Sequence, residues 1–340
     1  MENFEVIQIN RPEQEALIED FRAYFRDEVK ASRELFGVSL VSHHDSSIRF
    51  TNSTTSVMKP QILGTESFNQ PLYLAQPAMG QQGLYYWQRD RVFGPYASYF
   101  TSLGALYPSK SEGFDAGPAM ESLALRWGLG SSELRWVVYQ SDEDLIPLIE
   151  ETDIPIHVRD QEIGPYRHSY GLEDIGGRNA NLLAKDRTGT FRTLGSLTLI
   201  HGAEDILGYE ISFDSTTATS LTRDFAHPVL SHTTTRKNVS DDTLANVDML
   251  SVSAALLVEG MKPISKGRSG VLRKFMLEYT RLMKTESEAT VDDIQNGLSK
   301  AVEKEIEYRR HVISVGNTVI SQNAAEQTIS EWAKPLYELA

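Results

Sequence analysis

The stretch SLVSHHDSSIRFTNSTTSVMKPQILG, residues 39–64, decides the fold that this sequence predicts. Apolar residues at 38, 40 and 41 lead into a polar turn over 42–45, and Ile48-Arg49-Phe50 leads out of it. Alternation of apolar and polar residues on both sides of a turn is typical of two strands that place one face on a core. The stretch therefore predicts a strand, a turn and a second strand.

The segments around this stretch predict a mixture of helices and strands. Residues 11–35 carry apolar side chains at three- and four-residue spacing, which indicates an amphipathic helix. Residues 72–106 predict two strands separated by a polar loop from Gly80 to Asp90. Residues 117–150 predict a helix, a strand and a short helix, and residues 194–214 predict two more strands followed by another helix.

The last third of the chain predicts helices alone. Residues 231–246 are polar and contain few large apolar side chains, which indicates a loop and a boundary between two domains. Two helices are expected, one over 248–259 and one from 267 onward. Thr290 is expected to cap the last long helix, with Asp293 as its capping-box partner. The predicted fold class is α+β.

Composition excludes several classes of protein. No apolar run approaches the ~20 residues of a membrane span, and the N-terminus lacks the layout of a signal peptide, so no membrane contact and a cytoplasmic location are expected. The chain has no cysteine, and His43-His44 lacks carboxylates at ligand spacing, so no metal site is predicted. A net charge of −14 argues against a nonspecific nucleic-acid coat.

Two regions resemble alanyl-tRNA synthetase, a class II aminoacyl-tRNA synthetase. Residues 39–64 are similar to the opening of its catalytic core, with serine at position 42 where the family usually has proline. Residues 248–274 are similar to the helical domain that meets the tRNA acceptor stem. The matching elements of the first region are Ser39-Leu40-Val41, Asp45, Phe50-Thr51-Asn52, Lys59-Pro60 and Leu63-Gly64.

The resemblance implies an architecture of two domains. Residues 1–240 are expected to form a catalytic core, with an antiparallel class II sheet flanked by helices. Residues 241–340 are expected to form an all-helical domain that binds the tRNA acceptor stem. The chain stops at Ala340, so the family's editing domain and its oligomerising tail are not expected.

The resemblance also implies a pocket for an amino acid. Asp214 stands where the family has an aspartate that neutralises the substrate ammonium, and a buried carboxylate is suited to that role. Tyr170 stands where the family has a tryptophan, and Gly177 lies in the glycine-rich segment at the edge of the pocket. The cysteine and prolines of that segment are absent here, and Arg178-Asn179 stand there instead, which indicates altered pocket chemistry.

The expected site for ATP and Mg²⁺ departs from the family. Class II enzymes hold ATP with two strands and the loop between them. The positions of the family's phosphate-binding arginine, its loop lysine and its strand glutamate fall on Gly80, Leu84 and Thr101. The strands that hold the loop therefore match the family, whereas the ligands of the phosphates do not.

Three arginines are candidates for the missing phosphate contacts. Arg89 and Arg91 could replace them, because a guanidinium binds phosphate through two hydrogen bonds. Two solvated arginines on either side of Asp90 explain the same residues equally well. Arg223 is nearest to the family's helical arginine but comes two positions later, which rotates it by roughly 200° on a helix.

A basic segment interrupts the acidic chain between Lys262 and Lys284. By resemblance, it is expected to contact the phosphates of a tRNA acceptor stem. A solvated helix face explains the same charges equally well. The residues assigned to tRNA are Lys266, Arg268, Arg273 and Lys274.

Two functions stay open at this point. In the first, the chain is an enzyme that binds or activates a small amino acid by aminoacyl-adenylate or aminoacyl-tRNA chemistry. In the second, it is an inactive paralogue of a synthetase that binds an amino acid or tRNA for regulation. Asp214 and the basic segment favour the first function, and the altered ATP loop favours the second.

Overall fold

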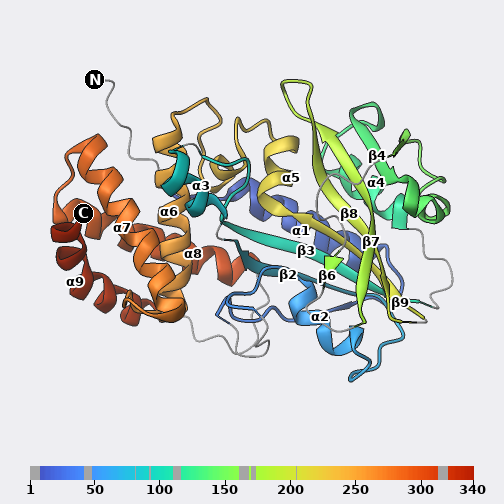
Figure 1. Ribbon diagram of the computed structural model, residues 1–340, viewed down its shortest axis with the longest axis horizontal. Helices are drawn as coiled ribbons and strands as arrows, with labels where there is room; N and C mark the ends of the chain where they lie inside the picture. The colour runs from blue at the N-terminus through green and yellow to red at the C-terminus, as the bar shows by residue number, and fades with distance from the viewer. Residues whose placement is uncertain are drawn as a thin grey trace.

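The computed structural model describes residues 8–41, 48–80, 82–91, 93–109, 116–160, 168–169, 174–203, 205–312 and 321–340. Within these residues one twisted sheet and a group of helices lie side by side, with the C-terminal helices at one end of the molecule and the sheet at the other (Figure 1). The predicted α+β class is confirmed. No helix in the described ranges is both long and apolar enough to cross a membrane.

The sheet has nine strands among the described residues, and all but one lie in the order β1-β2-β3-β9-β8-β7-β4-β5. The remaining strand, β6, pairs with β7. The bounds are β1 Arg33–Glu34, β2 Leu72–Met79, β3 Tyr99–Pro108, β4 Leu134–Tyr139, β5 Ile156–Arg159, β6 His168–Ser169, β7 Gly176–Lys185, β8 Phe191–His201 and β9 Ile206–Asp214.

The sheet is mixed, so the prediction of a purely antiparallel sheet is wrong in part. The strands from β2 to β4 in the spatial order pair antiparallel, as predicted. The two edge strands are parallel to their neighbours: β1 to β2 and β5 to β4. Each edge strand is reached by a connection that crosses over instead of a tight hairpin, and such a connection produces parallel pairing.

Nine α-helices and three short 3₁₀ helices accompany the sheet in the described ranges. The α-helices are α1 Pro12–Asp27, α2 Thr55–Ile62, α3 Gln82–Asp90, α4 Ala116–Arg126, α5 Ser215–Thr222, α6 Asp241–Val258, α7 Gly267–Ser287, α8 Val291–Val312 and α9 Gln322–Leu339. The 3₁₀ helices are η1 Ser131–Glu133, η2 Gln140–Leu148 and η3 Pro228–His232.

One face of the sheet is apolar and forms a core with α1 and α4. Alternate residues of the central strands point into this core, among them Leu103 of β3, Leu197 of β8 and Ile211 of β9. From α1, Phe21 and Phe25 pack into the same core as a pair of rings 4.9 Å apart. We call this side the apolar face, and the opposite side the polar face.

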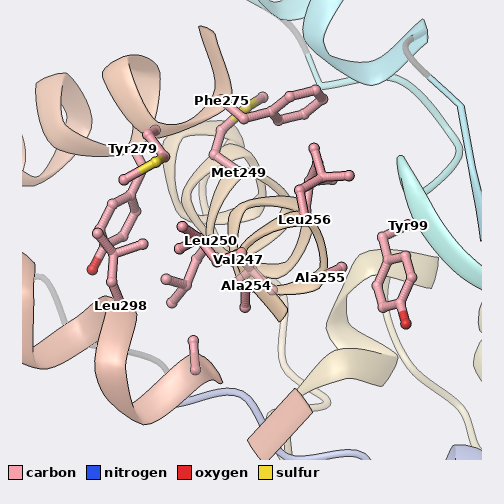
Figure 2. Packing of buried hydrophobic residues seen from close by; sticks show 14 of the residues in the cluster. Tyr99, Val247, Met249, Leu250, Ala254, Ala255, Leu256, Phe275, Tyr279 and Leu298 are labelled. Atoms are coloured by element: carbon pink, nitrogen blue, oxygen red, sulfur yellow. The ribbon is translucent and has the colours of Figure 1, made fainter. Parts of the chain in front are cut away.

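The C-terminal helices pack around α6, which is buried on every side. Figure 2 looks along this helix, and its side chains radiate in all directions toward α7, α8 and the sheet. Residues of the sheet end, including Met79 and Tyr99, belong to the same apolar cluster as α6. The helical region and the sheet region therefore share a core, and the division into two domains stays a prediction.

The predicted strand, turn and strand around residues 38–50 is wrong for the residues that are described, and residues 42–47 lie outside them. Residues 38–41 and 48–50 are irregular, and one backbone bond joins the two arms, from Thr51 N–H to the Leu40 carbonyl at 2.9 Å. Leu40 and Phe50 are buried in the cluster around α6, not on the sheet. The Leu40 N–H donates to Glu259 at the end of α6. An irregular segment that is buried beneath a helix can show the same alternation of apolar and polar residues as a strand.

The polar loop expected from Gly80 to Asp90 is the helix α3, so this prediction is also wrong. Leu84 and Trp87 are buried three residues apart, and α3 packs on α6 with these side chains. The helix α9 was not predicted at all, although Ala325, Ile329 and Leu336 have helical spacing and Ser321 caps its N-terminus.

Most of the remaining elements are confirmed. The helix after Asp214 is α5, and the helix predicted from 267 is α7. The helix predicted over 248–259 is part of α6, which begins at Asp241, so the loop predicted over 231–246 is wrong from residue 241 onward. The helix predicted over 11–35 is α1, which ends at Asp27. Thr290 and Asp293 form the predicted capping box before α8: the Thr290 N–H donates to Asp293 at 2.8 Å, and the Asp293 N–H donates to the Thr290 hydroxyl at 3.3 Å.

Candidate binding pocket on the polar face of the sheet

The polar face carries polar side chains on four adjacent strands. Strand pairing places Asn179 of β7, Thr198 of β8 and Glu210 of β9 in one row across the sheet. Asn181, Ser196 and Ser212 form the next row, and Ser102 pairs with Asp214 in a third. A sheet face packed on a core has apolar residues at such positions, so this face is built to contact polar groups.

All the residues of these rows except Thr198 line a cavity of about 400 Å³. Among the described residues, its polar lining contains two carboxylates and no lysine, arginine or histidine. Phe100 contributes an apolar side chain at its edge. Leu194 and Phe213 also border it, but their side chains lie in the core on the apolar face. The polar residues that line it are Ser53, Thr55, Tyr96, Ser102, Asn179, Asn181, Thr193, Ser196, Glu210, Ser212, Asp214 and Thr217.

The start of α2 lies directly on the sheet beside this cavity, because β3 has a glycine there. A Cβ atom at Gly104 would overlap the hydroxyl and Cβ of Thr54, so only glycine leaves room for this approach. Glu210 accepts a hydrogen bond from the Thr55 hydroxyl at 2.8 Å and another from Thr54 at 3.3 Å, both on Oε1. These bonds hold the Oε1 atom of Glu210 toward α2 at the wall of the cavity.

Asp214 ends β9 and caps α5. Its Oδ1 atom accepts from the backbone N–H of Thr216 at 2.7 Å and of Thr217 at 3.0 Å. Its Oδ2 atom has no hydrogen-bond partner among the described residues. Burial raises the pKa of Asp214, and the hydrogen bonds from Thr216 and Thr217 oppose that rise. One carboxylate oxygen is therefore fixed by the helix and the other is available.

Two buried polar atoms of the polar face lack partners. The Oδ1 atom of Asn179 and the hydroxyl of Thr198 have no hydrogen bond within the described structure, although both residues are buried. By contrast, Asn181 accepts from the Ser196 hydroxyl at 2.8 Å. Buried acceptors without a donor cost free energy unless water or a ligand supplies one. The polar face is consequently suited to a ligand that carries hydrogen-bond donors.

The predicted amino-acid-binding residues are only partly brought together. Asp214 lines the cavity, as the prediction requires. Gly177 lies in β7 two residues before Asn179, but it does not line the cavity. Tyr170 lies outside the described residues.

The three predicted phosphate-binding arginines are bound elsewhere. Arg223 follows the end of α5, and its guanidinium donates to the Trp127 carbonyl at 2.9 Å. Arg89 is exposed and donates to Asp90 at 2.8 Å. This fits the alternative that the sequence left open, in which Arg89 is a solvated arginine beside Asp90. Arg91 lies 3.4 Å from Glu278 of α7. None of the three lines the cavity.

The four predicted tRNA-binding residues lie at the N-terminal half of α7. Lys266 precedes the helix and is exposed, as is Lys274, and Arg273 is half-buried. Arg268 donates to the Ile48 carbonyl at 3.3 Å. None of the four forms an ion pair with any described residue.

Sequence reasoning missed Glu210, one of the two carboxylates that line the pocket. Polar residues recur at every second position in the strand segments of 179–181, 196–198 and 210–214. That period of two was used to predict strands, but the polar partners of the apolar positions were not taken as a site. Polar residues at every second position of several neighbouring strands are the signal that could have indicated such a pocket.

The chain matches no protein-family model, and a search of curated proteins finds no significant match. In the described ranges, no group of three or more carboxylate or imidazole side chains is placed to hold a metal ion.

Proposed function

We propose that this chain is an alanyl-tRNA synthetase-like protein that binds a small amino acid through its ammonium group in the polar-face cavity. The observation that supports this most is the charge of the lining: Glu210 and Asp214 face one cavity, and none of the described residues that line it is cationic. Two carboxylates in a partly buried site favour a cation between them, because the interaction is little screened by water.

The neutral residues of the cavity suit the rest of an amino acid. Amide groups of Asn179 and Asn181 and the hydroxyl of Ser102 can donate to a carboxylate. Phe100 borders the cavity and offers a contact for a small apolar side chain. In this proposal Asp214 contributes its unpartnered Oδ2 atom, and Glu210 contributes charge.

Among the two functions left open by the sequence, binding without activation is favoured. Activation requires positive charge at the α-phosphate of ATP, supplied by arginine and Mg²⁺. Arg89, Arg91 and Arg223 are bound to Asp90, Glu278 and the Trp127 carbonyl, away from the cavity. The proposed role is therefore that of an amino-acid-binding or regulatory module.

Activation by ATP and Mg²⁺ is the second candidate, and one observation favours it. The strands β2 and β3 pair antiparallel, and β9 pairs with β3 and runs directly into α5. This is the arrangement that the resemblance implies for an ATP loop beside the third class II signature. Exchange of pyrophosphate into ATP, with and without tRNA, separates the candidates: a strong signal with a small amino acid would support activation.

Calorimetric titration of each small amino acid tests the binding proposal. The free amino acid should bind, and its N-acetyl derivative should not, because acetylation removes the ammonium. Glu210→Gln should weaken binding roughly ten- to a hundredfold, the loss of one charge-assisted contact. Asp205→Asn removes an exposed charge from the turn before β9 and serves as the control. Equal binding of free and acetylated forms would contradict the proposal.

We also propose that the basic residues at the start of α7 bind a tRNA acceptor stem. If Lys266, Arg268, Arg273 and Lys274 neutralise about three phosphates, log affinity should fall with log salt at a slope near −3. An acceptor-stem hairpin should bind nearly as well as whole tRNA. The measurement is fluorescence anisotropy at several salt concentrations. Absence of binding at low salt would leave these side chains as a solvated helix face.

A further inference from the structure

A second cavity lies in the helical region, apart from the sheet. It has a volume of about 580 Å³ and lies between α6, α7 and α8, with Gln8 and Ile9 on one side. No residue of this cavity lines the polar-face cavity. Its volume is within the range of sites that hold small organic ligands.

Most of the wall is apolar, and a glycine lies in it beside a tyrosine. Leu250 of α6, Met283 of α7 and Ala301 of α8 contribute apolar surface. Tyr279 crosses from α7 with its hydroxyl against α8, as Figure 2 shows beside Leu298. A Cβ atom at Gly297 would overlap this hydroxyl, so the glycine makes room for Tyr279 against α8 at the wall of the cavity.

One buried amide points to a ligand. Asn246 of α6 is 7% exposed and lines the cavity, yet its Nδ2 atom has no hydrogen-bond acceptor within the described structure. A buried N–H without an acceptor is costly, and buried polar groups in native proteins are almost always partnered. Asn246 therefore places an amide with two unsatisfied N–H donors in the cavity wall, and an oxygen brought against it would satisfy them.

The charges around the cavity balance. Lys304 is paired with Glu307 at 2.7 Å, and Asp293 accepts the two capping bonds of Thr290. The remaining charged residues of the lining are Lys300 and Glu303, one of each sign. Such a lining favours neither an anion nor a cation. It is compatible with a neutral molecule that carries an accepting oxygen.

We propose that this cavity binds a small neutral molecule with an apolar body and a carbonyl or amide oxygen, which accepts hydrogen bonds from Asn246. The apolar body lies against Leu250, Met283 and Ala301. The site is independent of the amino-acid site proposed for the sheet, since the two cavities share no residue.

Three compounds with the same apolar body test the proposal: 4-phenylbutanamide, 4-phenylbutanoate and 4-phenylbutylamine. Titrations followed by protein NMR should show the amide binding at least tenfold more tightly than the amine or the carboxylate. Shifted resonances should come from α6, α7 and α8. Saturating small amino acid should leave the affinity for the amide unchanged, which separates this site from the sheet pocket.

Two variants should each remove the site. Asn246→Leu deletes the donors, so the amide should bind about tenfold more weakly. The same change relieves an unpartnered buried group, so the variant should fold with an unchanged or higher Tm. Gly297→Ala should push the Tyr279 ring into the cavity and block all three compounds.

The control is Asn323→Leu, an exposed position at the start of α9. It should leave binding unchanged. Tightest binding by the amine or the carboxylate would overturn the proposal. So would amide binding that neither Asn246→Leu nor Gly297→Ala weakens, or no binding of any of the three compounds.

Discussion

Two groups of buried carboxylates in this protein differ in how completely they are partnered. We call the first the junction network: Glu305 and Glu259 with Arg11 and Arg309, where the sheet region meets α8. Both oxygens of Glu305 are used, one by Arg11 at 2.5 Å and the other by Tyr99 at 2.5 Å and Arg309 at 2.7 Å. The second group is Glu210 and Asp214 in the polar-face cavity, where Asp214 keeps an oxygen without a described partner.

The difference separates a structural role from a binding role. A buried carboxylate whose oxygens are saturated by two guanidinium groups and a phenol can accept nothing more, and it holds its partners in place. Arg11 also lies 4.7 Å above the ring of Tyr308, so the network is packed as well as paired. A partly buried carboxylate with an unused oxygen is the kind of group that a ligand can complete.

The largest expected effect is on the junction network. Glu305→Gln leaves two buried guanidinium groups without their common counter-charge, and breaking a buried ion pair costs about 3–5 kcal/mol. The free energy of unfolding from urea titration measures this loss. The exposed pair Lys304–Glu307 is the control, because Glu307→Gln should cost less than about 1 kcal/mol. Equal losses of unfolding free energy at the two sites would show that full pairing of the Glu305 oxygens does not stabilise the fold.

Asp248 provides a pH-dependent test, because it is a buried carboxylate with one partner. Its Oδ1 atom accepts from the Ser98 N–H at 2.7 Å, its Oδ2 atom is unpartnered, and burial raises its pKa to about 7. Since the folded state then binds the proton more tightly than the unfolded state, stability is greatest at low pH and falls as pH rises from about 4 to about 7. The loss is on the order of 4 kcal/mol.

The matched variant is Asp248→Asn, which keeps the acceptor for Ser98 and has no charge. It should be more stable than the natural chain at pH 8, and the difference should shrink toward pH 5. Unfolding in urea at several pH values measures both. A variant that is less stable at pH 8 would contradict the assigned titration.

A smaller effect is expected where α2 lies on the sheet. Gly104→Ala places a methyl group against Thr54 and forces the start of α2 away from Glu210, at a cost of about 1–3 kcal/mol. Binding of a small amino acid should weaken as well, because Glu210 loses the hydroxyls that orient it. The control is Gly189→Ala in the β7–β8 turn. A Cβ atom there would meet no neighbour, but the φ of 82° is unfavourable for alanine, so stability should fall without loss of binding.

The smallest effect on stability is expected at Asp214. Asn is a good N-cap, so Asp214→Asn should change the free energy of unfolding by no more than about 0.5 kcal/mol while removing the charge. Amino-acid binding should nevertheless fall roughly tenfold or more. Asp214→Ala removes the cap too and should cost about 1 kcal/mol. Unchanged binding by calorimetry in both variants would exclude Asp214 from the site.

The sequence predicted those elements whose apolar pattern has one interpretation. The strands β8 and β9 alternate cleanly, and α1 repeats at helical spacing, so each was found. The segments around Leu40 and Phe50 were predicted as strands because burial against α6 gives the same local pattern as burial in a sheet. No local rule distinguishes these two, since the partner of the apolar side chain lies more than two hundred residues away in sequence.

The site was predicted less completely than the fold, for a physical reason. Asp214 was identified from the resemblance, and the cavity contains it. Glu210, Asn179 and Ser102 meet only through the register of four strands, which the sequence does not reveal. Arg89 and Arg91 were assigned to phosphates because a guanidinium can bind a phosphate through two hydrogen bonds. The pairing of Arg89 with Asp90 was the alternative that the sequence left open, whereas the position of Arg91 beside Glu278 depends on how α3 and α7 pack.

The bond between Arg11 and Glu305 has a consequence for synthesis on the ribosome. The two residues are separated by 294 positions, so Arg11 is synthesised long before Glu305 and cannot form this ion pair until Glu305 has emerged from the ribosome. At roughly 5–20 residues per second, that interval lasts on the order of 15–60 s. During this time α1 cannot settle in its final position beside α8. The packing of the N-terminal helix is therefore completed only after α8 has been translated.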